Sequence, residues 1–151
     1  MKQTDSKYPK FYLYNRIVKA KLFIDKNYKD NIDLDNIADE AYFSKFHFIR
    51  LFKSIYNKTP YQYLTQVRIE EAKHFLRLNY SVSDTCFMVG FDSTTSFTGL
   101  FKKVEGKTPS DYQIQNRLRQ EKIKANPLHF IPNCFAEKKG WSKNSNFQEV
   151  L

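Results

Sequence analysis

The sequence contains few glycines, prolines and cysteines, and each shortage excludes a class of structure. Only 4 glycines and 5 prolines interrupt 151 residues, so helices meet few breakers and an all-α fold is expected. The 2 cysteines, Cys86 and Cys134, lack the spacing of a disulfide framework or a zinc knuckle. No apolar run approaches the ~18 residues of a membrane span, and the amino-terminal segment lacks the apolar core of a secretory signal. The composition therefore favours a soluble, cytoplasmic protein with no membrane partner.

The sequence also lacks the residue groupings that catalysis and cofactor binding require. Its 3 histidines, His47, His74 and His129, have no acidic or cysteine partner at the spacing of a metal site or an activated nucleophile. No glycine-rich phosphate loop is present. We therefore expect that the protein is not an enzyme and binds no metal or cofactor.

Positive charge, by contrast, is in excess. The formal net charge is +9, and residues 44–118 carry 11 basic and 6 acidic side chains, a net charge of +5. A basic surface of this kind attracts polyanions, although charge alone does not distinguish it from a solvated face. No acidic residue lies between Glu40 and Glu70, an interval that contains Lys45, Arg50, Lys53, Lys58 and Arg68.

One segment of 18 residues occurs twice in similar form. Residues 51–68 and 100–117 are identical at 9 of 18 positions at a constant offset of 49. Each copy contains the residue types that end one helix and begin another. Asn57 and Gly106 tolerate the left-handed conformation that ends a helix. The next helix begins with a Thr-Pro pair, in which threonine caps the helix and proline is its first residue. The Thr-Pro pairs are Thr59-Pro60 and Thr108-Pro109, with Gln62 and Asp111 placed to complete a capping box.

The repeat extends upstream and predicts two similar units. Each unit has a short helix (34–41; 82–89), a turn, and a longer helix (44–56; 93–105), with Ser44 and Ser93 as candidate caps. Ala38 corresponds to Cys86, so Cys86 is expected to be a small core residue. A short helix that is crossed closely by a second one is the helix-turn-helix pattern. A helical solenoid is the alternative, but solenoids generally need three or more units.

The longer helix of the first unit has an unusual outer face. Helical periodicity places His47, Phe48, Leu51, Phe52 and Ile55 inward. Exposed apolar residues between cations are poor choices for solvation, but they can contact thymine methyl groups in a DNA major groove. This pattern favours DNA contact by the outward residues, which are Lys45, Phe46, Ile49, Arg50 and Lys53.

The second unit carries the sequence VGFDSTTSFTGLFKKVEGKTPSDYQ. This segment resembles the signature of the AraC/XylS family of bacterial transcription regulators, and the resemblance extends over about residues 11–117. The segment SKFHFIRLFK (44–53) is also similar to the first recognition helix of small stand-alone members of the family. The matching signature residues are Val89, Gly90, Phe91, Phe97, Phe101, Lys102, Lys103, Gly106, Pro109 and Tyr112.

The resemblance implies two homeodomain-like three-helix units, each with a recognition helix that contacts double-stranded DNA. By position, Phe46, Ile49 and Arg50 of the first unit would meet base edges. Gly99 stands where an arginine is common in the stand-alone relatives. In the second unit the contacts would come from Thr94, Thr95, Ser96 and Thr98. We expect phosphate contacts from Ser44, Lys58, Ser93, Lys102, Lys103 and Lys107.

The expected organisation suits binding to DNA by a single chain. A helix over 60–79 would span about 30 Å, close to the ~34 Å between successive major-groove segments on one face of B-DNA. We therefore expect a monomer on DNA, associated with the nucleoid, with RNA polymerase as a further candidate partner. A nonspecific or architectural nucleic-acid-binding protein is the alternative. The expected segments are an arm (1–10), the two units (11–58 and 81–118), the linker helix (59–80) and a basic, aromatic tail (119–151).

Two further expectations concern the ends of the chain. Leu13, Ile17, Ala20 and Ile24 form one apolar stripe on a helix over 11–27, which should pack on the first unit. The tail contains Phe130, Phe135, Trp141 and Phe147 among polar residues. This composition favours a strap that docks on the helical body over a free tail.

Overall fold

The structure is a computed structural model that describes residues 7–33, 37 and 44–140. Every regular element within these residues is helical, which confirms the all-α fold. The elements are α1 (Lys7–Asn27), α3 (Lys45–Tyr56), α4 (Pro60–Arg77), α5 (Val82–Met88), α6 (Thr94–Glu105), α7 (Pro109–Ala125), the 3-10 helix η1 (Pro127–Phe130) and α8 (Asn133–Lys138).

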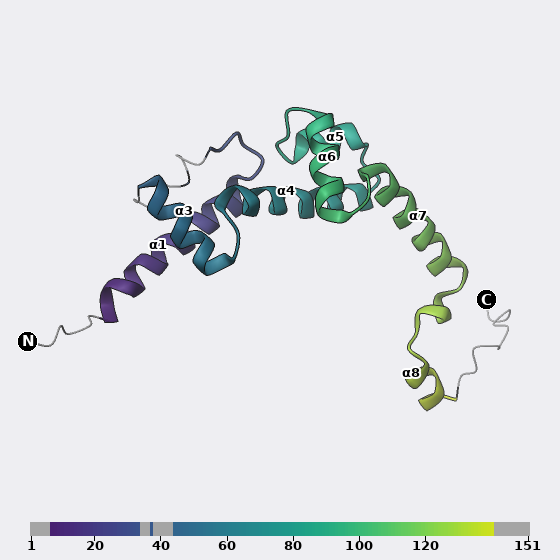
Figure 1. The fold of residues 1–151 in the computed structure, drawn as a ribbon. Coiled ribbons are helices and arrows are strands. Elements are labelled where there is room, and N and C mark those ends of the chain that lie inside the picture. The colour runs from purple at the N-terminus through teal and green to yellow at the C-terminus, as the bar shows by residue number, and fades with distance from the viewer. Residues whose placement is uncertain (1–6, 34–36, 38–43, 141–151) are drawn as a thin grey trace, which may run out of the picture.

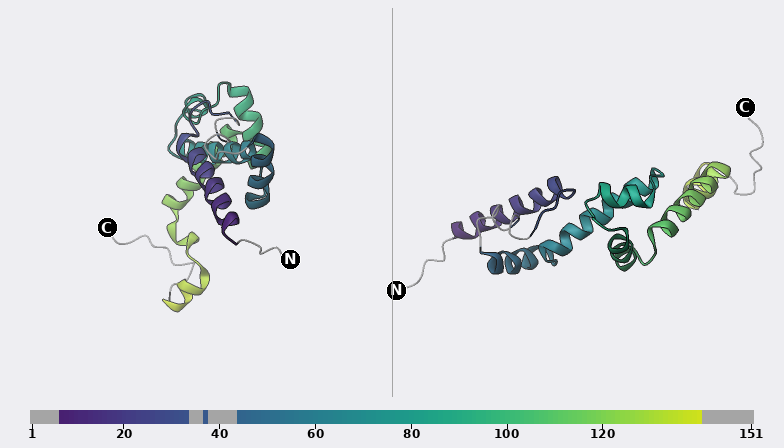
Figure 2. Two further views of the ribbon diagram at one scale, coloured as in Figure 1. Left: turned by 90° about the vertical axis from the view of Figure 1, so that its left-hand side faces the viewer. Right: turned by 90° about the horizontal axis from the view of Figure 1, so that it is seen from above.

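Helix α4 is the central spine of the molecule (Figure 1). Helices α1 and α3 pack at its beginning, and α5 and α6 pack at its end. The view from above in Figure 2 shows α3 and α6 on the same side of α4, whereas α1 lies on the other side. We call α1 and α3 with Ile37 the first unit, and α5, α6 and the start of α7 the second unit.

Each unit has its own hydrophobic core, and α4 contributes to both. In the first unit, Ile17, Ala20 and Ile24 of α1 are fully buried against Phe48 and Phe52 of α3, together with Ile37 and with Leu64 of α4. The stripe predicted on α1 is therefore confirmed, with Leu13 half-buried. In the second core, Ile69, Ala72 and Leu76 of α4 pack with Cys86, Val89, Phe91, Phe97 and Phe101.

The sequence repeat is also a repeat of core geometry. In the first unit the Phe48 and Phe52 ring centroids lie 5.5 Å apart, and those of Phe52 and Tyr63 lie 5.7 Å apart. The equivalent rings of the second unit, Phe97, Phe101 and Tyr112, have separations of 5.7 Å and 5.6 Å. The aromatic residues that recur at an offset of 49 therefore build the same aromatic core twice.

The predicted helix boundaries of the repeat are largely confirmed. Asn57 and Gly106 end α3 and α6 with φ of 55° and 75°, both in the left-handed region. Thr59 and Gln62 form a reciprocal capping box at α4. At α7 the Thr108 hydroxyl accepts from the Asp111 N–H in the same way. Ser44 differs from expectation, because its side chain makes no capping hydrogen bond.

Replacing Thr59 with alanine should lower the free energy of unfolding by about 1 kcal/mol, because the capping hydrogen bond to the Gln62 N–H is lost. Thermal unfolding followed by circular dichroism would measure this change. Ser44→Ala is the matched control, since the Ser44 side chain makes no such bond. An equal loss of stability in both variants would contradict the role given to the cap.

Several predicted bounds need correction. The linker helix ends at Arg77 rather than 79, because Asn79 adopts a left-handed φ of 65°. Helix α1 begins at Lys7 rather than 11. The short helix predicted over 34–41 lies outside the described residues except for Ile37, which is helical and buried.

The tail differs from the expected strap. Helix α7 continues to Ala125 and so carries the chain away from the two units (Figure 1). Beyond the end of α7, η1 folds back against α7, and α8 follows. The Phe130 side chain lines a cleft with Gln115, Leu118, Arg119 and Lys122, all of which belong to α7. In the described part of the tail, η1 therefore packs on α7. Trp141 and Phe147 lie outside the described residues.

Candidate nucleic-acid interface

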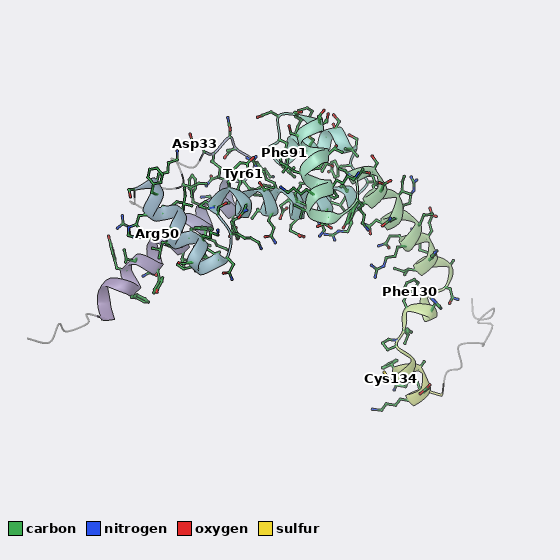
Figure 3. All side chains as sticks on the ribbon, in the orientation of Figure 1. Asp33, Arg50, Tyr61, Phe91, Phe130 and Cys134 are labelled. Carbon is green, nitrogen blue, oxygen red and sulfur yellow. The ribbon has the colours of Figure 1, made fainter. Side chains whose placement is uncertain are left out.

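Helix α3 presents the predicted outer face to solvent. Lys45, Arg50 and Lys53 are exposed, and Phe46 is 86% exposed, the largest value among the exposed large hydrophobic residues. Figure 3 marks Arg50 on this helix. Ile49 is only half-buried at the edge of the face. This surface therefore combines three positive charges with an exposed aromatic ring, so it offers both charge and apolar area for contact.

His47 was assigned to the wrong face. It was predicted to point inward with Phe48, but the structure exposes it on the same side of α3 as Arg50. Adjacent residues are separated by about 100° around a helix, so with Phe48 at the centre of the buried face His47 falls beyond its edge. The inner face consists instead of buried Phe48 and Phe52, with Leu51 and Ile55 half-buried.

Helix α6 presents a face of short side chains. Thr94, Thr95 and Ser96 are exposed, Thr98 is half-buried and Gly99 is exposed. The Ser93 hydroxyl caps the helix by accepting from the Ser96 N–H at 3.4 Å. A β-carbon on Gly99 would meet no atom within 4 Å, so the space beside this residue is open.

The predicted phosphate contacts surround these two faces, but they are not equivalent. Ser44, Lys58, Ser93, Lys102 and Lys103 are exposed. Lys107 is half-buried, and its ammonium group donates a hydrogen bond of 2.7 Å to the Gln115 side-chain oxygen. Within this set, internal hydrogen bonds therefore engage the Lys107 ammonium group and the Ser93 hydroxyl group.

A polar seam joins the two units beside α4. The Arg68 guanidinium donates to the carbonyl oxygens of Tyr28 at 2.7 Å and Asp30 at 2.8 Å. It also lies over the Phe91 ring, with Cζ 5.5 Å from the ring centroid. Burial lowers the pKa of Arg68 from its ordinary value, but the two carbonyls still receive a charge-assisted hydrogen bond each. Arg68 therefore connects the segment after α1 to the turn before α6.

Gly90 of the second unit lies against the backbone of the segment after α1. It has a φ of +85°, and a β-carbon there would lie 2.5 Å from the Lys29 carbonyl oxygen. Only glycine allows this approach of the two backbones. Within the second half of the molecule, Lys73 ties α4 to α6, because its ammonium group lies 3.0 Å from a Glu105 carboxylate oxygen and 3.1 Å from one of Glu70 on its own helix. Sequence reasoning did not find the seam, although the identity of Arg68 and Arg117 in the repeat was a signal.

The described residues lack a cluster for metal binding and a helix that could span a membrane. They contain no group of three or more histidine, cysteine or acidic side chains that could hold a metal ion. Cys86 is fully buried in the second core, as predicted, and burial raises the pKa of its thiol. None of the described helices combines the length and the apolar character needed to cross a membrane.

Comparison with known proteins shows which family this chain resembles. Residues 37–115 match the family model described as "Helix-turn-helix domain". The chain is 35% identical over 94 residues to an HTH-type transcriptional regulator from the cgkA 5′ region of Pseudoalteromonas carrageenovora, covering 62% of this chain and 56% of that protein. It is 35% identical over 78 residues to the transposon Tn10 TetD protein of Escherichia coli, covering 51% and 56%. The chain thus spans about half the length of these two relatives.

The fold is shared with solved structures. The DNA-binding domain of the global transcriptional factor AdpA, solved in complex with a target DNA, superposes with a TM-score of 0.67 at 26% identity, covering 70% of this chain and 96% of that one. An AraC-type DNA-binding domain protein from Chromobacterium violaceum superposes with a TM-score of 0.63 at 22% identity, covering 68% and 93%, which shows a common fold. The two units on a shared helix, the family match and these likenesses agree, so the chain belongs to the AraC family of helix-turn-helix transcription regulators.

Proposed function

We propose that this protein regulates transcription by binding a specific DNA sequence, with α3 and α6 inserted into successive major-groove segments of one site. The observation that carries this proposal is the placement of α3 and α6 on the same side of α4 (Figure 2). With 18 residues, α4 is about 27 Å long, which is comparable to the ~34 Å between successive major-groove segments. The solved complex of AdpA with its target DNA supports the same role for this chain.

In this proposal α3 reads bases. Arg50 is exposed and can donate two hydrogen bonds to the edge of one guanine. Phe46 and Ile49 have no polar atoms, so they would pack on thymine methyl groups or exclude a wrong base. Lys45 and Lys53 add positive charge on either side of Arg50, where the phosphate backbones border the groove.

In this proposal α6 distinguishes bases less well than α3 and contributes mainly contacts to phosphates. The hydroxyl groups of Thr94, Thr95, Ser96 and Thr98 are short, so each reaches a single base edge or a phosphate. Gly99 contributes no side chain. Contacts to phosphates would come from Ser44, Lys58, Ser93, Lys102, Lys103 and Lys107, which border the two recognition helices in sequence.

The proposal assigns residues 11–58 and 81–118 to the two reading units, with 59–80 as the linker, 1–10 as an arm and 119–151 as a tail. Because both recognition helices lie on one chain, the protein would bind as a monomer. It would act in the cytoplasm on the nucleoid, with RNA polymerase as a further candidate partner. It would have no catalytic activity.

Selection of bound sequences from random duplex DNA tests the function. The expected product is one asymmetric site of about two helical turns, occupied by one protein chain when the complex is sized. Enrichment of no sequence would instead identify a nonspecific or architectural protein. Two chains on the minimal site would contradict the monomeric arrangement.

The selected site should show a stronger base preference in the half contacted by α3 than in the half contacted by α6. A bidentate arginine discriminates bases better than short hydroxyl groups do. Base changes in the distal half-site should each cost well under the usual ~1–3 kcal/mol. Gly99→Arg should tighten binding and increase base preference in that half-site, since the position is open and helix propensity favours arginine by ~1 kcal/mol. Gly99→Ala separates the propensity effect from the new contact. Two equally sharp half-sites in the wild type would refute the asymmetry.

A further inference from the structure

A groove lies between the two units, on neither recognition face. It is bordered by the turn between α3 and α4, by the first turns of α4, and by the carboxyl-terminal half of α6. Its volume is about 680 Å³. Lys58, Tyr61, Gln62 and Gln66 form one wall, and Leu100, Lys103 and Val104 form the other. Figure 3 marks Tyr61 between Arg50 of the first unit and Phe91 of the second. We call the groove between these two walls the inter-unit groove.

The chemistry of the inter-unit groove is that of a site for a nucleic-acid backbone. No acidic side chain lines it, and the two lysines stand on opposite walls. Between the lysines are apolar surfaces, including Tyr61, which is 64% exposed, and Val104, which is 46% exposed. A DNA backbone alternates anionic phosphates with apolar sugar edges. Charged rims around apolar patches match this alternation, whereas a purely apolar ligand would leave both cations without a counterion.

The amide side chains add donors for phosphate oxygens. The Gln62 side-chain oxygen is occupied by the Thr59 N–H in the capping box, which leaves its amide nitrogen as the hydrogen-bonding end. The second copy of the repeat indicates how Lys58 and Gln66 can cooperate. There the equivalent residues, Lys107 and Gln115, meet at 2.7 Å. Lys58 and Gln66 have the same spacing, so both can reach one small anionic group in the groove.

We propose that the inter-unit groove binds the sugar–phosphate backbone between the two half-sites, with Lys58 and Lys103 contacting phosphates from opposite walls. This inference rests on the proposed function. If α3 and α6 occupy successive major-groove segments, then the backbone that borders the intervening minor groove passes between them. The inter-unit groove lies between α6 and the turn that follows α3, so it is placed to meet that backbone. The contacts add affinity without reading bases.

The test compares Lys58→Gln and Lys103→Gln, singly and together, with Lys19→Gln and Lys26→Gln. The control lysines are exposed on α1, which lies on the other side of α4, and they remove the same charge. Binding to a duplex that carries the selected site and to a random duplex is measured between 50 and 200 mM salt. Each single groove variant should reduce the steepness of log affinity against log salt by about one, and the double variant by about two. Each should weaken binding to both duplexes by the same factor. The control variants should leave the slope nearly unchanged.

A second measurement locates the contact. Uncharged methylphosphonates replace the phosphates between the two half-sites, and they should weaken the wild type but not the Lys58→Gln/Lys103→Gln variant. No effect on the wild type, or equal effects of groove and control lysines, would overturn the inference and leave the groove to another ligand. Footprinting of the same complexes keeps the two claims apart. Protection of one half-site only would defeat the proposed function, whereas two protected half-sites without a central effect would defeat only the groove.

Discussion

Replacing Gly90 with alanine should lower the free energy of unfolding by about 2 kcal/mol or more. Two costs combine at this position. The φ of +85° lies in the left-handed region, where a β-carbon costs about 1–2 kcal/mol. That β-carbon would also lie 2.5 Å from the Lys29 carbonyl oxygen and 2.9 Å from that of Tyr28, so the segment after α1 must move. This segment carries the carbonyls that Arg68 holds, so the seam between the units would loosen.

Gly106→Ala is the matched control for this prediction. Gly106 has a similar φ of +75°, but its β-carbon would meet open space. It therefore measures the backbone cost alone, and the difference between the variants measures the collision with the first unit. Urea denaturation followed by helical circular dichroism would give both values. Equal stability of the two variants would show that the contact between Gly90 and the segment after α1 does not hold the units together.

Replacing Arg50 with alanine should weaken binding to the selected site by about 1–3 kcal/mol, or roughly 5- to 150-fold. The side chain is exposed on α3, so protein stability should be nearly unchanged. The loss should come with relaxed preference at one G·C pair, because a bidentate donor to guanine disappears. Competition between the selected duplex and variants at each base pair would locate that pair.

Arg50→Lys is the control that separates base reading from charge. Lysine keeps the positive charge but lacks the planar fork that meets two guanine acceptors together. If Arg50 reads a base, the lysine variant should bind random DNA normally and lose most of its preference at that pair. Equal weakening of Arg50→Ala on selected and random DNA would instead identify Arg50 as a phosphate contact.

Much of the local structure could be predicted because its causes lie within a few residues along the chain. The capping box of Thr59 and Gln62 and the left-handed ends at Asn57 and Gly106 are three- or four-residue events. The exposure of Lys45, Phe46, Arg50 and Lys53 follows from helical periodicity against the buried Phe48 and Phe52. His47 was misplaced because periodicity leaves residues at the edge of an apolar stripe ambiguous. The DNA contacts of these residues stay predictions.

The sequence by itself therefore determined the helix boundaries within the repeat, the inward Phe48 and Phe52 and the exposed cations of α3, since these depend on short-range spacing. Only the tertiary structure decided how the units are placed. The hydrogen bonds of Arg68 to residues 40 and 38 positions away, and the approach of Gly90 to Lys29, depend on how α4 is rotated against its neighbours. No local pattern encodes that rotation, because it results from packing two cores on one helix. The same rotation places α3 and α6 on one side, opens the groove between them, and directs α7 away from the body.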